Sequence, residues 1–133
     1  MSAEQLKDFL RARGCPEPAV NAGLAGLVED WERIAGEIER GYSVGLDDYL
    51  NDLDARELIA AAIAAVPKAL SPALRRRLDA ADRTARAALV PAGRCLWGPK
   101  LAALNRWDAE SHWWYYMVPA RPGDELKKDL EAR

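Results

Sequence analysis

The side chains that could carry chemistry gather in three places, and the first surrounds the only histidine. Six aromatic residues lie before or after His112 in the C-terminal third of the chain: Trp97, Trp107, Trp113, Trp114, Tyr115 and Tyr116. Imidazole is the side chain whose ordinary pKa lies nearest neutral pH. Aromatic rings with a polar tip are common at recognition hot spots and in small-molecule pockets. The group predicts a binding surface, with a ligand-binding or enzymatic pocket around His112 as the alternative.

The simplest structural explanation for the same aromatic residues is that they close one end of a hydrophobic core. Their exposure decides between the two interpretations. Exposed rings favour recognition, rings that line a cavity favour a ligand, and fully buried rings belong to the core.

The second place is an acidic segment that begins at residue 47. Asp48, Asn51 and Asp52 share a helix face, because residues three and four apart are neighbours. Together with Asp47 these oxygen ligands suit Mg²⁺, and they form a weaker alternative in which the protein binds a metal. Acidic residues are also favoured at a helix start by the macrodipole. An EF-hand is excluded, since the required glycine and glutamate positions hold Asp52 and Leu58.

The third place is a basic helix predicted within residues 74–86. It carries Arg75, Arg76 and Arg77, followed by Arg83 and Arg86. Residues 68–106 hold nine basic and two acidic side chains, a charge of +7, whereas residues 1–57 sum to −7. A basic helix could bind nucleic-acid phosphates. The acidic half would repel them, so nucleic acid is the second alternative and is not the expected partner.

Other catalytic and cofactor patterns are missing from the sequence. There is no Gly-x-Gly-x-x-Gly, no phosphate-binding loop and no Gly-x-Ser-x-Gly. Cys15 and Cys95 are too far apart in sequence to resemble a zinc motif, and we expect both to be free thiols. We therefore predict no catalytic residue and no cofactor, and a non-enzymatic protein is favoured over an enzyme.

Hydrophobic periodicity predicts that helices position these groups. The clearest stripe runs from Val20 to Ile38 at spacings of three and four. Further helices are predicted up to Gly14, over 47–53, from Asp54 to Pro67, after Ser71-Pro72, over 100–105 and over 124–132. Asp54 is the predicted cap of its helix, because Glu57 follows three residues later as in a capping box. The predicted core consists of Trp31, Ile34, Ile38, Leu58, Ile59, Ile63, Leu74, Leu78 and Leu89.

The segment from His112 to Val118 is predicted to be extended, because aromatic residues favour strands. Its suggested partner is Tyr42–Val44, in a two-stranded hairpin. The predicted fold class is mainly α: one compact bundle of about five or six helices, with an aromatic-rich, partly extended C-terminal segment.

Composition sets the remaining limits. A chain of 133 residues, half of them apolar and 30% charged, predicts one globular domain over 1–133. The longest apolar run is about ten residues, too short to cross a bilayer, and the acidic N-terminus is unlike a secretory signal. We therefore expect a cytoplasmic protein without a membrane partner.

Taken together, these features predict a small protein-interaction module such as an adaptor, an immunity-type inhibitor or a regulatory subunit. Its partner is expected to be another protein, and self-association is left open. Polarised charge suits electrostatic recognition of such a partner.

Overall fold

The computed structural model describes residues 2–132, with only the backbone of Ser2; Met1 and Arg133, the ends of the predicted domain, lie outside them. Within that range the fold is mainly α, as predicted. Its elements follow in the order α1 Ser2–Ala12, α2 Glu17–Glu39, α3 Leu46–Ala65, the 3₁₀ turn η1 Pro67–Ala69, α4 Pro72–Ala87, β1 Leu89–Pro91, α5 Pro99–Asn105, the 3₁₀ turn η2 Trp113–Tyr116, β2 Met117–Pro119 and α6 Asp124–Glu131.

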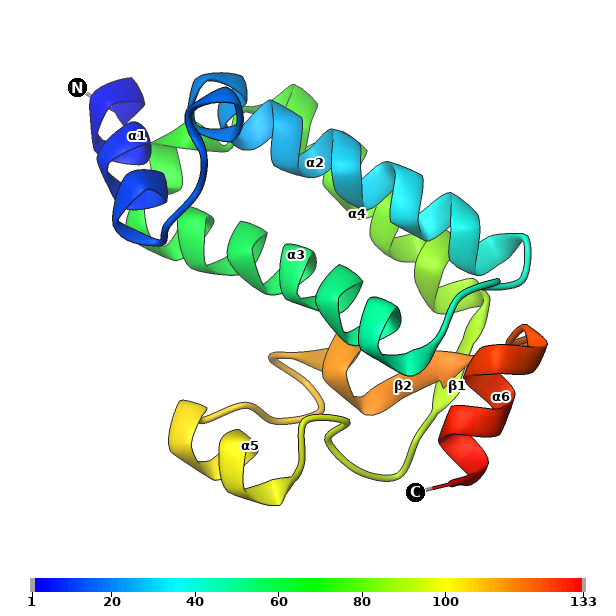
Figure 1. The fold of residues 1–133 in the computed structure, drawn as a ribbon. Coiled ribbons are helices and arrows are strands. Elements are labelled where there is room, and N and C mark those ends of the chain that lie inside the picture. The colour runs from blue at the N-terminus through cyan, green and yellow to red at the C-terminus, as the bar shows by residue number, and fades with distance from the viewer. Residues whose placement is uncertain (1, 133) are drawn as a thin grey trace.

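The long helices α2, α3 and α4 pack together and form the upper part of the molecule (Figure 1). The apolar stripe of α2 is buried as predicted, with Trp31 fully enclosed. Gly23 interrupts this helix with φ +66, a conformation that glycine adopts at no steric cost. The start of α4 is also as predicted, since the Ser71 hydroxyl accepts a hydrogen bond from the Leu74 amide at 3.2 Å.

Helix α3 corrects one prediction, because it is continuous where two helices were expected. Asp54 was assigned as a helix cap, but it lies in the middle of α3. Its carboxylate accepts side-chain hydrogen bonds from Tyr115 and Trp97 instead of capping backbone amides. A local capping pattern cannot reveal such a distant partner, and the prediction was wrong for that reason.

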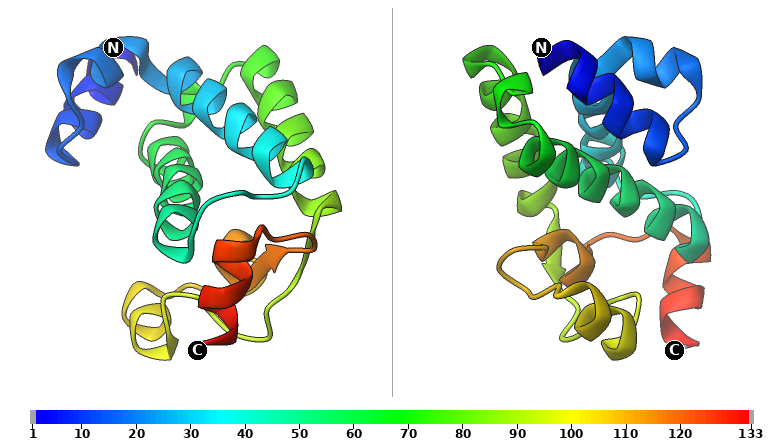
Figure 2. Two further views of the ribbon diagram at one scale, coloured as in Figure 1. Left: turned by 45° about the vertical axis from the view of Figure 1, so that its right-hand side comes forward. Right: turned by 90° about the vertical axis from the view of Figure 1, so that its left-hand side faces the viewer.

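The C-terminal third lies below the long helices in all three views (Figures 1 and 2). The predicted hairpin with Tyr42–Val44 is wrong, because β2 pairs antiparallel with β1, placing Val90 opposite Val118. Of the segment predicted to be extended, only Met117 and Val118 belong to a strand, and residues 113–116 form the turn η2. Tyr42 takes another role: its carbonyl accepts a hydrogen bond from the Gly123 amide at 2.6 Å.

Helix α6 holds the start of α3. Its Leu126 is fully buried, and Asp129 Oδ2 accepts a hydrogen bond from the Leu46 amide at 3.0 Å. Asp129 thus satisfies one of the first amides of α3, as a local cap residue would. The close approach needs Gly45, where a Cβ atom would lie 2.9 Å from the Asp129 carboxylate.

Six of the nine predicted core residues are buried, and the prediction was wrong for the other three. Leu58, Ile63 and Leu74 are only partly buried at the edge of the core. Other buried residues lie outside the predicted core set: Leu10, Tyr42, Tyr49, Leu53, Arg56 and Leu126. Tyr49 is buried with its hydroxyl donating to the Met117 carbonyl at 2.9 Å, which joins α3 to β2.

Within the described residues, no helix has the length and apolar character needed to span a membrane.

Candidate functional site

The aromatic group divides into buried and half-buried members. Trp113, Trp114 and Tyr115 are 8%, 2% and 1% exposed. The half-buried members are Trp97, Trp107, His112 and Tyr116. A partner protein contacts side chains at the protein surface. Direct contact with this group is therefore restricted to its half-buried members. The recognition role of the whole group stays a prediction.

A buried ionic junction fastens the aromatic group to the long helices. Asp82 on α4 accepts two hydrogen bonds from the Arg56 guanidinium, both at 2.9 Å, and one from the Trp31 indole at 2.8 Å. The Arg56 guanidinium also lies over the Trp114 ring, 4.6 Å from its centroid. Arg56 is 8% exposed and is the one buried charged residue in the described part of the chain. Helices α2, α3, α4 and η2 therefore meet at a single ion pair.

Asp54 makes a second junction between α3 and the C-terminal third. Its Oδ1 atom accepts from the Tyr115 hydroxyl at 2.6 Å and from the Trp97 indole at 3.1 Å. Burial and the neighbouring Asp54 carboxylate raise the pKa of Tyr115, so this phenol stays protonated and keeps donating. Sequence spacing could not detect this arrangement, because Asp54 and Tyr115 are 61 positions apart.

His112 lies at the edge of the aromatic group. Its ring centroid is 5.1 Å from that of Trp114 and 5.9 Å from that of Trp107, and its Nδ1 is 2.9 Å from the Ser111 hydroxyl oxygen. A neighbouring pocket of about 310 Å³ is lined by Ser111, Trp113 and Trp114 but not by His112. The imidazole packs against these rings, and among the described residues no carboxylate is hydrogen-bonded to its second ring nitrogen.

Burial lowers the pKa of His112 below 6.5, outweighing the opposite effect of Glu57 and Asp108. The unfolded chain therefore takes up the proton first as the pH falls. His112 contributes stability that is present above pH 6.5 and is lost as the pH falls through its folded-state pKa. In urea unfolding at pH 7.5 and 5.5, His112→Gln should lose less stability than the wild type. An equal loss in both proteins would contradict this expectation.

The side chains of Asp47, Asp48 and Asp52 do not converge on a metal site in the described residues. Asp47 and Asp48 are exposed on the first turn of α3. Asp52 is half-buried and accepts a hydrogen bond from the Tyr42 hydroxyl, and burial raises its pKa. No cluster of three or more histidine, cysteine or acidic residues that could hold a metal occurs in residues 2–132.

The basic helix is partly neutralised from within the protein. Arg77 forms a two-bonded ion pair with Glu32 of α2, and Arg86 lies over the Trp113 ring, 4.8 Å from its centroid. Arg75 and Arg76 are exposed and form no ion pair with another described residue. The acidic and basic parts of the sequence thus meet across α2 and α4, and their charges are only partly separated in space.

Helix α5 carries an exposed apolar surface that was not predicted from the sequence. Of its seven residues only Ala102 is buried. Leu104 is 78% exposed and Leu101 is 38% exposed, the first being by far the most exposed large apolar side chain described. A signal existed in the sequence, since Leu101 and Leu104 lie three positions apart in a helix of seven residues.

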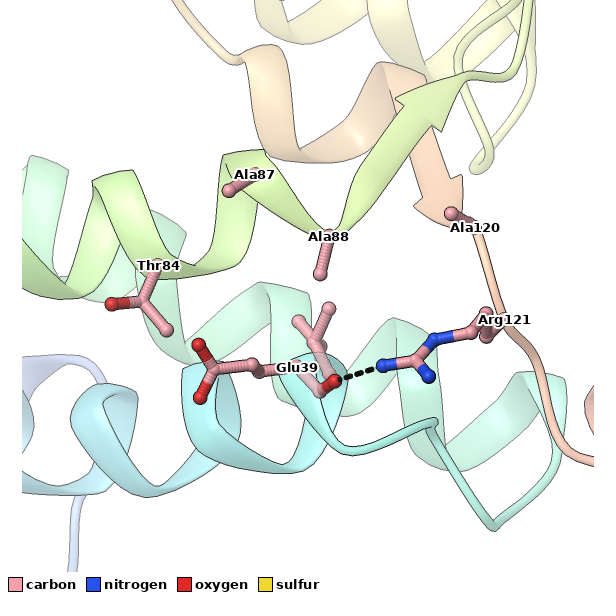
Figure 3. Close-up of a pocket in the computed structure, with 7 residues that line it drawn as sticks. Glu39, Thr84, Ala87, Ala88, Ala120 and Arg121 are labelled. Atoms are coloured by element: carbon pink, nitrogen blue, oxygen red, sulfur yellow. Dashed lines mark hydrogen bonds between the residues drawn. The ribbon is translucent and has the colours of Figure 1, made fainter.

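A pocket of about 320 Å³ lies where α2 and α4 end (Figure 3). Its apolar wall is formed by Ile38, Ala87, Ala88 and Ala120. The polar members are Glu39, Thr84 and Arg121, and the Arg121 guanidinium donates to the Glu39 carbonyl at 2.9 Å. None of these residues belongs to a site predicted from the sequence.

The chain matches no protein-family model, no curated protein and no solved structure.

Proposed function

We propose that the protein is an interaction module that binds another protein through the α5 surface, defined as Lys100, Leu101, Leu104 and Arg106. The observation that carries the proposal is the exposure of Leu104 and Leu101 on the same side of one short helix. Large apolar side chains that cluster at a surface commonly mark a site of association.

The position of α5 supports this role. The helix lies at the lower edge of the molecule, apart from α2 and α4 (Figures 1 and 2). Its ends are set by Pro99 at the start and by Arg106, which adopts a left-handed conformation with φ +57. The framework therefore presents the helix outward, and a partner can reach it without displacing the core.

Charge indicates the kind of partner. Lys100 and Arg106 flank the two leucines, and Arg94 precedes them, with no acidic residue from 83 to 107. All three basic side chains are exposed and form no ion pair with another described residue. The complementary partner is a protein with an apolar groove and an acidic rim.

The enzyme and nucleic-acid alternatives have less support. His112 does not line the neighbouring pocket, and Arg77 is already paired with Glu32. Nucleic-acid binding would show as a salt-dependent mobility shift that weakens in a triple variant in which Arg75, Arg76 and Arg77 are changed to alanine.

Leu104→Asp is expected to weaken partner binding by about tenfold to thirtyfold, since it removes an apolar anchor and places a negative charge against an acidic rim. The matched control is Val44→Asp, because Val44 is 39% exposed and lies outside α5. Proteins captured from native lysate by the wild type, Val44→Asp and Leu104→Asp are identified by mass spectrometry. Each candidate is then purified and titrated against the three proteins.

A partner that is retained by the wild type and by Val44→Asp but not by Leu104→Asp supports the proposal, provided that added salt weakens its binding. Equal binding by all three proteins would refute the α5 surface. Light scattering of the isolated protein is a further check. A dimer that Leu104→Asp dissociates would make the occupant of α5 a second copy and overturn the assignment of an acidic protein partner.

A further inference from the structure

The pocket at the ends of α2 and α4 places opposite charges on opposite walls (Figure 3). The carboxylate of Glu39 lies on the side of Thr84, and the guanidinium of Arg121 lies on the side of Ala120. Between them Ala88, the residue that links α4 to β1, points into the pocket. A volume of about 320 Å³ is at the lower end of the range for ligand pockets, so an occupant must be small.

The polar groups of this pocket retain bonding capacity. The Glu39 carboxylate and the Thr84 hydroxyl form no ion pair or hydrogen bond with another described side chain. A guanidinium has five N–H donors, and Arg121 donates one of them to the Glu39 carbonyl. The two charged groups also do not pair with each other, since Arg121 bonds to the backbone of Glu39 and not to its carboxylate.

These features describe one chemical class of ligand. A carboxylate group matches the free edge of the Arg121 guanidinium, where two parallel hydrogen bonds can form. An ammonium group matches the Glu39 carboxylate and the Thr84 hydroxyl, which lie on the same side of the pocket. Alanine methyl groups and Ile38 leave room for only a short apolar side chain.

We propose that this pocket binds a free α-amino acid with a small aliphatic side chain. Arg121 holds the carboxylate, Glu39 and Thr84 hold the ammonium group, and the side chain rests on Ala87, Ala88 and Ile38. The proposal is independent of the α5 surface, which lies on other elements.

Isothermal titration of the full chain with glycine, L-alanine and L-valine tests the ligand class. Two matched compounds each lack one charge: L-alaninamide has no carboxylate and N-acetyl-L-alanine has no ammonium group. L-Alanine or one of its two relatives should bind saturably, and each matched compound should bind at least about tenfold more weakly than L-alanine. No saturable binding up to roughly 10 mM, or equal binding of all the alanine compounds, overturns the proposal.

Three variants locate the site. Glu39→Gln should weaken amino-acid binding at least about tenfold, whereas Glu29→Gln, an exposed position on the same helix, should not change it. Ala88→Leu fills the pocket without altering any charge and should abolish binding. Circular dichroism confirms that each variant is folded before titration. Unchanged affinity in Glu39→Gln or Ala88→Leu would show that the amino acid binds elsewhere.

Discussion

Asp82→Ala is expected to lower the free energy of unfolding by about 3–5 kcal/mol, the largest effect of any polar substitution described for this protein. The Asp82 carboxylate accepts the side-chain hydrogen bonds that Arg56 and Trp31 donate. Its removal leaves Arg56, a residue that is 8% exposed, without a counter-ion. An uncompensated buried charge costs more than the lost attraction alone, because the group cannot return to water.

Urea unfolding followed by circular dichroism measures this effect, with Asp79→Ala as the matched control. Asp79 lies one turn earlier on α4 and is exposed, so its substitution should change stability by less than about 0.5 kcal/mol. Similar losses in the two variants would contradict the role given to Asp82.

Replacing both charged partners provides a sharper test of the same junction. In the double variant Arg56→Met with Asp82→Leu, no charge is left buried. We expect it to be more stable than Asp82→Leu alone, because apolar replacements of similar size often substitute for a buried ion pair. A double variant that is less stable than Asp82→Leu would show that stacking of Arg56 on Trp114 outweighs the unpaired charge.

Trp114→Ala is expected to cost about 3–5 kcal/mol, since it removes a large ring from the contact between α3 and the C-terminal third. The Trp114 ring lies under Arg56 and beside His112, and it meets Trp113 edge to face at 5.6 Å. Its loss opens a cavity that these rigid neighbours cannot close. Chemical denaturation of the purified variant gives the free energy directly.

Trp114→Phe and Trp31→Phe form an informative pair. Both substitutions remove the same atoms, but the Trp114 indole N–H has no acceptor among the described residues, whereas the Trp31 indole donates to Asp82. Trp31→Phe should therefore be more destabilising, by about 1.5–3 kcal/mol for a hydrogen bond to a charged group. Equal losses would imply that the Trp31 bond adds no net stability.

Several features of the fold could be predicted because their causes are local. The stripe from Val20 to Ile38 repeats at the helical period, and Ser71 with Pro72 marks a helix start. The prediction of an extended C-terminal segment was wrong for residues 113–116. Aromatic residues favour strands on average, but residues 113–116 make a 3₁₀ turn, in which the rings of Trp113 and Trp114 pack against Arg56, Arg86 and Trp31.

The candidate sites were harder to predict. Spacing singled out Asp52 for a metal, yet the structure bonds this carboxylate to Tyr42. Glu39, Thr84 and Arg121 reach one pocket from three segments, and no sequence window contains them all. The sequence shows that Leu104 is apolar but not that it is exposed. Its 78% exposure depends on the position of α5, which lies away from the long helices.

By itself the sequence determined that this protein is helical, where most of its helices run and that its charge is divided along the chain. These properties follow from hydrophobic period, capping residues and composition, each of which acts over a few neighbouring residues. Tertiary structure alone decided that Asp54 and Asp82 anchor the aromatic rings, that three of those rings are buried and that two leucines face solvent. The hydrogen bonds of Asp54 and Asp82 join residues that are 26 to 61 positions apart, and a local sequence pattern carries no information about such contacts.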